Sequence, residues 1–262
     1  MLLLGSILMI GNPSLLIFAQ SNSTSSNDSN GNNDSKVSNA TSGEAALTAK
    51  DQSSEAIPSA QSVYDSGVMS IPSSVKGVIV FIPDEAHHPP TDQKTISPKN
   101  PNYVPATLEV PEGTEVAYVH DDPNHVHQSI VKDKSGNLAW TSTSFVFPAG
   151  SDSKSLSLSG SPYTVSDKDY SPPMEGKIVV TPQKSTGTQT IGAFFCPTSQ
   201  VSDCKSDFTK AGFKVLSEYN FVTKTVQKDI AGDNTLLIYS TTTPLDSAIK
   251  SLGPLIKTLP YK

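Results

Sequence analysis

The stretch Pro105-Ala-Thr-Leu-Glu-Val-Pro-Glu-Gly-Thr-Glu-Val-Ala-Tyr-Val-His-Asp-Asp-Pro-Asn-His-Val-His127 alternates short β-forming runs with turn-forming residues. Val110-Pro-Glu-Gly113 places proline and glycine where a tight turn needs them, and Asp121-Asp-Pro-Asn124 forms a second turn. The runs on either side of this second turn, 114–120 and 125–131, are therefore predicted to be strands that pair as a hairpin.

The same pattern of short β-rich runs between prolines and glycines extends from Tyr64 to about residue 182. It contains no convincing helix, so residues 61–182 are predicted to form an all-β domain, a sandwich or a barrel. The expected strands are 75–82, 106–110, 114–120, 125–131, 143–147, 155–158, 161–165 and 177–181.

Composition excludes several classes of function. The chain has 262 residues, 35% of them hydrophobic, its 19 basic residues are all lysine, and its formal net charge is -6. It offers no arginine cluster or basic patch to neutralise phosphates, so we expect no nucleic-acid binding. It also has no Ser/His/Asp arrangement in a suitable context, no phosphate-cradling glycine loop and no nucleotide fingerprint, so we do not expect an enzyme.

The amino-terminal part is typical of an export segment followed by a stalk. Residues 1–19 are almost entirely apolar, as in a signal peptide, or they remain as an N-terminal membrane anchor. Residues 20–60 are rich in Ser, Asn, Asp, Gly and Thr, which predicts a disordered linker. This linker carries glycosylation sequons at Asn22, Asn27, Asn33 and Asn39. We therefore expect an extracytoplasmic glycoprotein, secreted, pseudoperiplasmic or held at the cell surface.

After a polar hinge at 183–189 the pattern changes from all-β to mixed. Strand-like runs at 190–196, 213–222 and 235–241 alternate with helical stripes at 201–211 and 245–259, in the order β-α-β-β-α. Residues 188–262 are therefore predicted to form a small α+β domain.

The second region also holds the only two cysteines of the chain, Cys196 and Cys204. In an exported protein such an isolated pair is expected to form a disulfide. Free thiols and copper ligation are the alternatives.

All five histidines lie between His87 and His127, and three of them, His120, His125 and His127, fall in the stretch 105–127. Imidazole is the commonest metal-ligating side chain, so this clustering favours a metal site. In an extended chain His125 and His127 project from one face at roughly 6.5 to 7 Å, close enough to share an ion that His120 could join. The alternative is that these histidines are exposed and bind nothing, and for His87 and His88 a solvated loop is the better interpretation.

Over about residues 100–182 the order of elements resembles the cupredoxins, or blue copper domains, as a divergent, archaeal-type member. The resemblance rests on the 105–116 segment, the His-bearing strand after it, Phe147-Pro-Ala-Gly150, a Tyr-bearing strand and Met174-Glu-Gly-Lys-Ile-Val-Val180. It implies a Greek-key β-sandwich in which His127 is the first copper ligand and Met174 is the weak axial ligand.

Two of the family's ligands, a cysteine and a second histidine, come from a loop that here reads Ser166-Asp-Lys-Asp-Tyr-Ser-Pro-Pro-Met174 and contains neither. A blue copper centre depends on a thiolate. Without it we expect a harder site, suited to Cu(II) or Zn(II), in which His125, Asp167 and Asp169 compensate. Solvated turn residues for the two aspartates, and core packing for Met174, are the alternatives.

Two hypotheses for the function follow from these patterns. The first is a copper-binding exported protein that takes part in copper handling or electron transfer. Its partners would be a metal ion and a redox partner protein, with a membrane contact only through an N-terminal anchor. The second is a metal-free structural or interaction module at the cell surface, built on the same scaffold.

Overall fold

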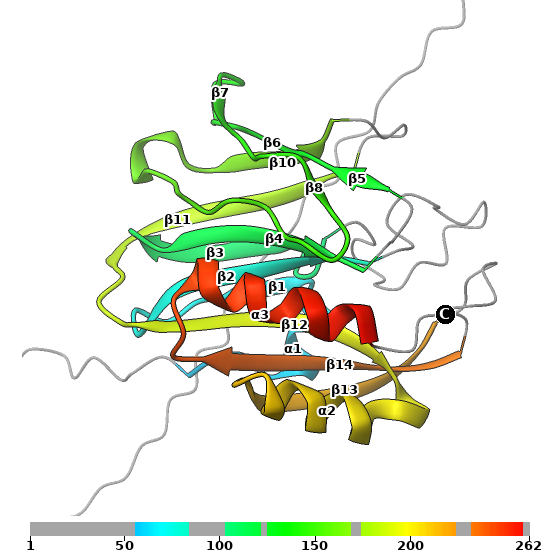
Figure 1. Ribbon diagram of the computed structural model, residues 1–262. Coiled ribbons are helices and arrows are strands. Elements are labelled where there is room, and N and C mark those ends of the chain that lie inside the picture. Colours follow the sequence, from blue (N-terminus) through cyan, green and yellow to red (C-terminus); the bar gives the residue numbers. More distant parts are fainter. Residues whose placement is uncertain (1–55, 84–102, 122–124, 169–173, 224–231, 259–262) are drawn as a thin grey trace, which may run out of the picture. The chain divides into compact units, whose positions relative to one another are not determined.

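The computed structural model describes residues 56–83, 103–121, 125–168, 174–223 and 232–258 (Figure 1). The signal-like segment, the stalk with its four sequons, and the segments that carry His87, His88 and Asp169 lie outside these residues. Within the described ranges, no helix is long and apolar enough to cross a membrane.

Two mixed sheets of six strands each make up most of the structure. The first sheet has the order β1 (Val68–Ser70), β3 (Thr107–Glu112), β11 (Gly176–Lys184), β10 (Tyr163–Asp167), β6 (Ser129–Lys132), β7 (Leu138–Thr141). The second has the order β13 (Lys214–Thr223), β14 (Gly232–Thr241), β12 (Gln189–Pro197), β2 (Val75–Ile82), β4 (Glu115–His120), β9 (Lys154–Ser155). A small separate sheet pairs β5 (Val126–His127) with β8 (Phe145–Val146).

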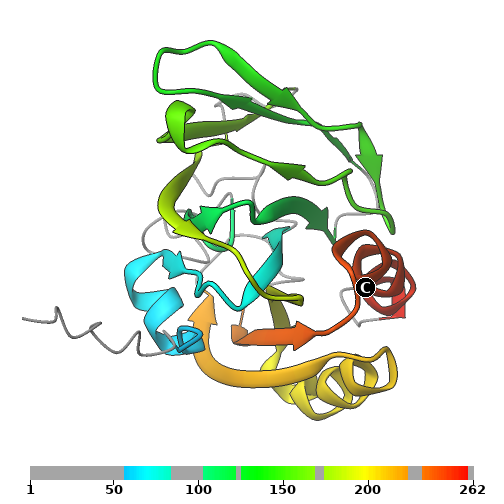
Figure 2. The ribbon, with the colours of Figure 1, turned by 90° about the vertical axis from the view of Figure 1, so that its left-hand side faces the viewer.

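The helices lie around the second sheet (Figure 2). Helix α1 (Ala60–Ser66) packs against β13 and β14, α2 (Val201–Lys210) against β12 and β13, and α3 (Leu245–Thr258) against β2 and β4. Two short 3-10 helices are η2 (Leu158–Gly160) and η3 (Thr198–Gln200).

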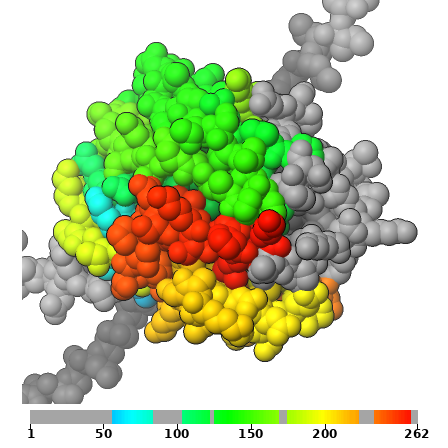
Figure 3. All heavy atoms as spheres, viewed as in Figure 1, coloured from blue at the N-terminus to red at the C-terminus, as the bar shows by residue number. Residues whose placement is uncertain are grey.

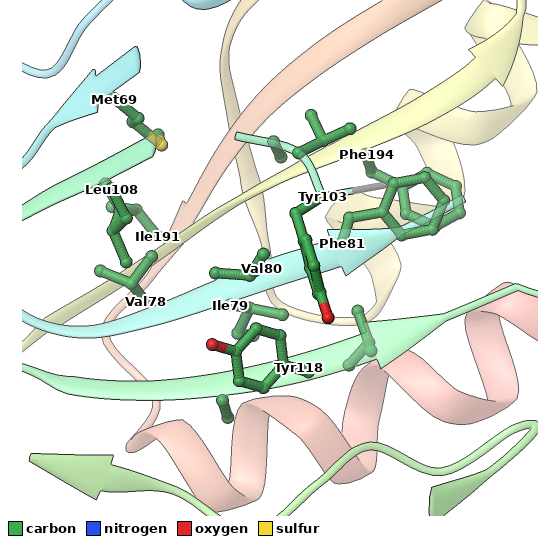
Figure 4. Close-up of a cluster of buried hydrophobic side chains, with 14 of the residues drawn as sticks. Met69, Val78, Ile79, Val80, Phe81, Tyr103, Leu108, Tyr118, Ile191 and Phe194 are labelled. Carbon is green, nitrogen blue, oxygen red and sulfur yellow. The ribbon is translucent and has the colours of Figure 1, made fainter. Parts of the chain in front are cut away.

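Side chains from both large sheets share one apolar core. Leu108 of β3 lies beside Val78 of β2 and Ile191 of β12 (Figure 4). Farther along, the Phe81 and Phe194 rings are 4.5 Å apart between centroids. Burial of such side chains is the main favourable contribution to folding. The predicted β-sandwich is therefore confirmed.

Strand predictions succeeded where the apolar pattern was strong, as for β2, which spans 75–82 as expected. The prediction that the first region contains no helix was wrong, because α1 occupies 60–66. Its ends carry standard signals: the Ser59 side chain accepts from Ser62 N at the start, and Gly67 adopts a left-handed conformation with φ 69° at the end. Strands β1 and β7 were not foreseen either.

The predicted hairpin between 114–120 and 125–131 was also wrong. Strand β4 pairs in parallel with β2, where Ile82 lies opposite His120, and its other edge pairs with β9. Both edges of β4 are thus occupied, and the run 125–131 does not pair with it. The run instead divides into β5, which pairs with β8, and β6, which lies between β10 and β7 in the first sheet.

The carboxy-terminal elements follow the predicted order β-α-β-β-α. However, β12 pairs with β2 in parallel on one side and with β14 on the other, so these strands continue the second sheet of the sandwich. All the described residues belong to one compact unit. A separate α+β domain at 188–262 is therefore not confirmed.

The aromatic side of the core gives a prediction at high pH. Burial raises the pKa of Tyr239 well above the ordinary 10.0, and its ring packs on Phe208 and Phe213 at 4.9 and 5.3 Å between centroids. Above pH 10 the unfolded chain releases a proton that the folded protein still holds, so stability decreases as pH rises. Tyr239→Phe should reduce this slope by about 1.4 kcal/mol per pH unit.

The measurement is urea unfolding of both proteins between pH 9 and pH 12. Tyr219→Phe, at a half-buried tyrosine, is the control for loss of a phenol. Identical slopes for wild type and Tyr239→Phe would contradict the prediction.

Candidate metal site between the two sheets

His120 and His127 approach each other from different sheets. His120 ends β4, and His127 is the last residue of β5, where alternation exposes Val126 by 45% and buries His127 completely. His120 is 1% exposed. The two ring centroids are 4.6 Å apart, with 62° between the planes. The sequence pattern predicted these two imidazoles in one hairpin. In the structure they come from different sheets and meet in the buried interior.

Asp167 contacts the His127 ring at Nδ1. It ends β10, in register with Ser129 of β6, and its Oδ2 lies 3.0 Å from His127 Nδ1, with both side chains fully buried. The same oxygen accepts the backbone N–H of Gln128 at 3.2 Å. Because a carboxylate accepts, Nδ1 donates in this contact, and the lone pair of a neutral ring then lies on Nε2.

Phe145 completes the aromatic surroundings of the two histidines. It lies opposite His127 in the β5–β8 pair, and its ring centroid is 5.4 Å from that of His120 and 5.9 Å from that of His127. Sequence reasoning missed this residue. Alternation within 143–147 marks it as buried, but only the pairing of β8 with β5 identifies what it contacts.

Hydrogen bonds to Ser142 fix the backbone that follows His127. Ser142 N donates to Ser129 O at 2.9 Å, Ser129 N donates to Ser142 Oγ at 3.0 Å, and Gln128 Nε2 donates to Ser142 O at 3.0 Å. The direction of the His127 side chain is thus set by a paired backbone rather than by a free loop.

The other predicted ligands are less closely connected to this pair. His125 is half exposed, so it differs from His127 in burial although the two were expected to project together. Met174 is 1% exposed and lies two residues before the start of β11, while Asp169 is outside the described residues. In the part of the chain that the structure describes, no group of three or more His, Cys, Asp and Glu side chains is arranged to hold a metal ion.

Asp167 also acts electrostatically on Tyr103. The pKa of Tyr103 is raised well above 10.0, first by burial, then by Tyr118 and then by Asp167. The phenol therefore stays protonated and neutral at physiological pH.

The thiolate of a blue copper centre does not fit this chain. Cys196 of β12 and Cys204 of α2 form a disulfide, both residues are fully buried, and their Cα atoms are 6.6 Å apart. They are the only cysteines of the sequence. The donors left for a metal are nitrogen, oxygen and thioether groups.

The chain matches no protein-family model and no curated protein. Among solved structures it is similar to rusticyanins. Reduced rusticyanin is 14% identical over 44% of this chain and 85% of that chain, with a TM-score of 0.30. Rusticyanin from Thiobacillus ferrooxidans is 16% identical over 44% of this chain and 82% of that chain, with a TM-score of 0.28. A third match, described as a copper protein, is 16% identical over 44% and 84% of the two chains, with a TM-score of 0.29.

Proposed function

We propose that this chain is an exported, divergent cupredoxin-like protein that binds a copper ion mainly through nitrogen and oxygen donors and serves in copper handling. The observation that carries the proposal is the buried contact of His127 with Asp167, beside the His120 ring. No catalytic step is assigned to the protein.

The orientation of His127 supports metal binding. A histidine that ligates a metal usually donates its other ring N–H to a carboxylate, which fixes the ring and makes the ligating nitrogen more basic. Asp167 makes this contact with Nδ1, so Nε2 is the proposed ligand atom. Asp167 itself, first considered a ligand, then acts as a positioning residue.

The distance between the two rings supports a shared ion. Imidazoles bound at about 2.0–2.1 Å in adjacent coordination positions place their centroids roughly 4.5 to 5 Å apart. The His120 and His127 centroids are 4.6 Å apart. We propose His125, Met174 and Asp169 as the source of further donors.

The donor set favours Cu(II), with Zn(II) as the alternative. At sites built from nitrogen and oxygen ligands, Cu(II) binds most tightly of the divalent first-row transition-metal ions. Because both cysteines are in the disulfide, the potential and colour that a thiolate gives are not expected. Copper storage or delivery outside the cytoplasm suits such a site better than electron transfer to a redox partner protein, and no nucleic acid is involved.

The second candidate is a metal-free structural or interaction module on the same scaffold. It is favoured by the packing of the His120, His127 and Phe145 rings on one another, which an ordinary core also shows. Among the described residues, the lack of a three-donor group favours it as well.

Copper titration of the purified protein separates the two candidates. We expect one Cu(II) per chain by calorimetry and elemental analysis, an EPR signal of a tetragonal centre, and only weak d–d absorbance. His127→Asn should weaken copper binding at least about tenfold. The asparagine amide can still donate a hydrogen bond to Asp167 from the position of Nδ1, but it has no metal-ligating atom at the position of Nε2.

His125→Asn makes the same substitution at the half-exposed histidine and shows whether that side chain contributes. Equal affinity of wild type and His127→Asn, or no stoichiometric copper at all, would refute the copper site and support the metal-free module. An intense band near about 600 nm would instead show a thiolate centre.

A further inference from the structure

We propose that the cleft between α3 and the loop 148–153, here named the α3 cleft, binds a small organic cation, a primary amine carried on an apolar body. The cleft has a volume of about 600 Å³, within the range of small-molecule sites. One wall is the loop after β8, and the other is the face of α3 with Asp246, Ile249 and Lys250. Figure 3 shows α3, in red, lying directly against the green surface.

The walls of the α3 cleft are held by close backbone contacts. A Cβ on Gly150 would lie 2.7 Å from the carbonyl oxygen of Tyr118, and a Cβ on Gly253 would lie 2.0 Å from that of Pro148. Ser151 N donates to Tyr118 O and Ser151 Oγ accepts from Tyr118 N, each at 2.9 Å. The loop is thus tied to β4 and lies close against α3, where Gly150 meets the Ile249 side chain and Gly253 meets the Pro148 backbone, so the cleft is formed before a ligand arrives.

The charged groups of the α3 cleft select a cation. Asp152 Oδ1 accepts from Thr143 N at 2.7 Å and from Thr143 Oγ1 at 3.1 Å, and Asp246 Oδ1 accepts from Ser153 Oγ at 3.1 Å. These bonds orient both carboxylates. Among the described residues, neither Oδ2 atom has a hydrogen-bond partner. With Lys250 as the only cation among the described residues of the lining, two negative charges face one positive charge.

The size of the α3 cleft and its apolar wall favour an amine with an alkyl chain over a metal ion. Ile249, 7% exposed, lies in the wall with Pro148 and Ala149. These side chains can cover an alkyl chain while an ammonium group donates to Asp152 or Asp246. A bare cation would leave most of the volume unfilled and would make no use of the apolar wall.

The test is a titration of the ¹⁵N-labelled protein with n-pentylamine and, separately, with pentanoate, which has the same chain length and the opposite charge. We expect n-pentylamine to shift the amide resonances of 148–153 and 246–250, and pentanoate to leave them unchanged. Asp152→Asn and Asp246→Asn should each weaken n-pentylamine binding about two- to fivefold, as expected for loss of one exposed charged contact.

Asp203→Asn is the matched control, since Asp203 is an exposed carboxylate in the first turn of α2, outside the cleft. It should not change the affinity for n-pentylamine. Shifts outside the two segments, equal binding of pentanoate, or unchanged affinity in the Asp152→Asn/Asp246→Asn double variant would overturn the proposal. Tighter binding of Ca²⁺ than of n-pentylamine at the same segments would also overturn the proposal, because it would identify a metal site.

Discussion

His127→Ala is expected to lower the free energy of unfolding by about 3–5 kcal/mol, as for other buried pairs that lose one partner. The substitution leaves the Asp167 carboxylate inside the protein without the imidazole that it contacts at 3.0 Å. It also opens a void beside His120 and Phe145, whose rings pack on His127. Urea unfolding of metal-free protein, followed by tryptophan fluorescence from Trp140, measures the effect.

His127→Asn is the control for this loss. It keeps a donor for Asp167 and most of the side-chain volume near the backbone, so its destabilisation should be clearly smaller than that of His127→Ala. If both variants lost the same free energy of unfolding, the hydrogen bond to Asp167 would not be what stabilises the site.

Removal of the disulfide should be the next largest effect. Cys196→Ala with Cys204→Ala opens a cross-link between positions eight residues apart, which costs about 2–3 kcal/mol through the greater freedom of the unfolded chain. Both cysteines belong to the buried hydrophobic core, so small voids are added to this loss. Thermal unfolding of the double variant measures the loss.

Wild-type protein unfolded and refolded in reductant provides the comparison for the double variant, because it lacks the cross-link but keeps the sulfur atoms. Its stability should lie between those of oxidised wild type and the double variant. A double variant as stable as oxidised wild type would show that the disulfide contributes nothing to folding.

The sequence predicts individual strands and helices of this protein better than their partners. The continuous apolar run of β2 and the helical stripe of α3 are local patterns, and both elements lie where these patterns place them. Pairing depends on which edges are already occupied. Nothing near His120 in the sequence indicates that β2 and β9 take both edges of β4, so a hairpin through 121–124 was wrongly predicted.

In the candidate site, too, the sequence predicts the residues better than their contacts. The three clustered histidines are visible in the sequence, and the family resemblance points to His127 and to the loop that holds Asp167. The structure brings His120, His127 and Asp167 together, but through the packing of three sheets that no spacing rule describes. Phe145 enters the site only because β8 pairs with β5.

The failure to predict helix α1 has a different cause. Its seven residues carry no long apolar stripe, although Ser59 and Gly67 mark both of its ends. Caps without periodicity do not distinguish a short helix from a loop at the boundary between the polar linker and the first β-rich run.

The position of β12 affects how the protein is made. This strand is translated after all the strands of the first sheet, yet it lies between β2 and β14. Until the ribosome has released residues 189–241, the nascent chain presents β2 with one edge open and its apolar residues uncovered. Completion of the second sheet therefore has to wait until residues 189–241 are available, which delays folding and leaves an apolar strand edge open in the meantime.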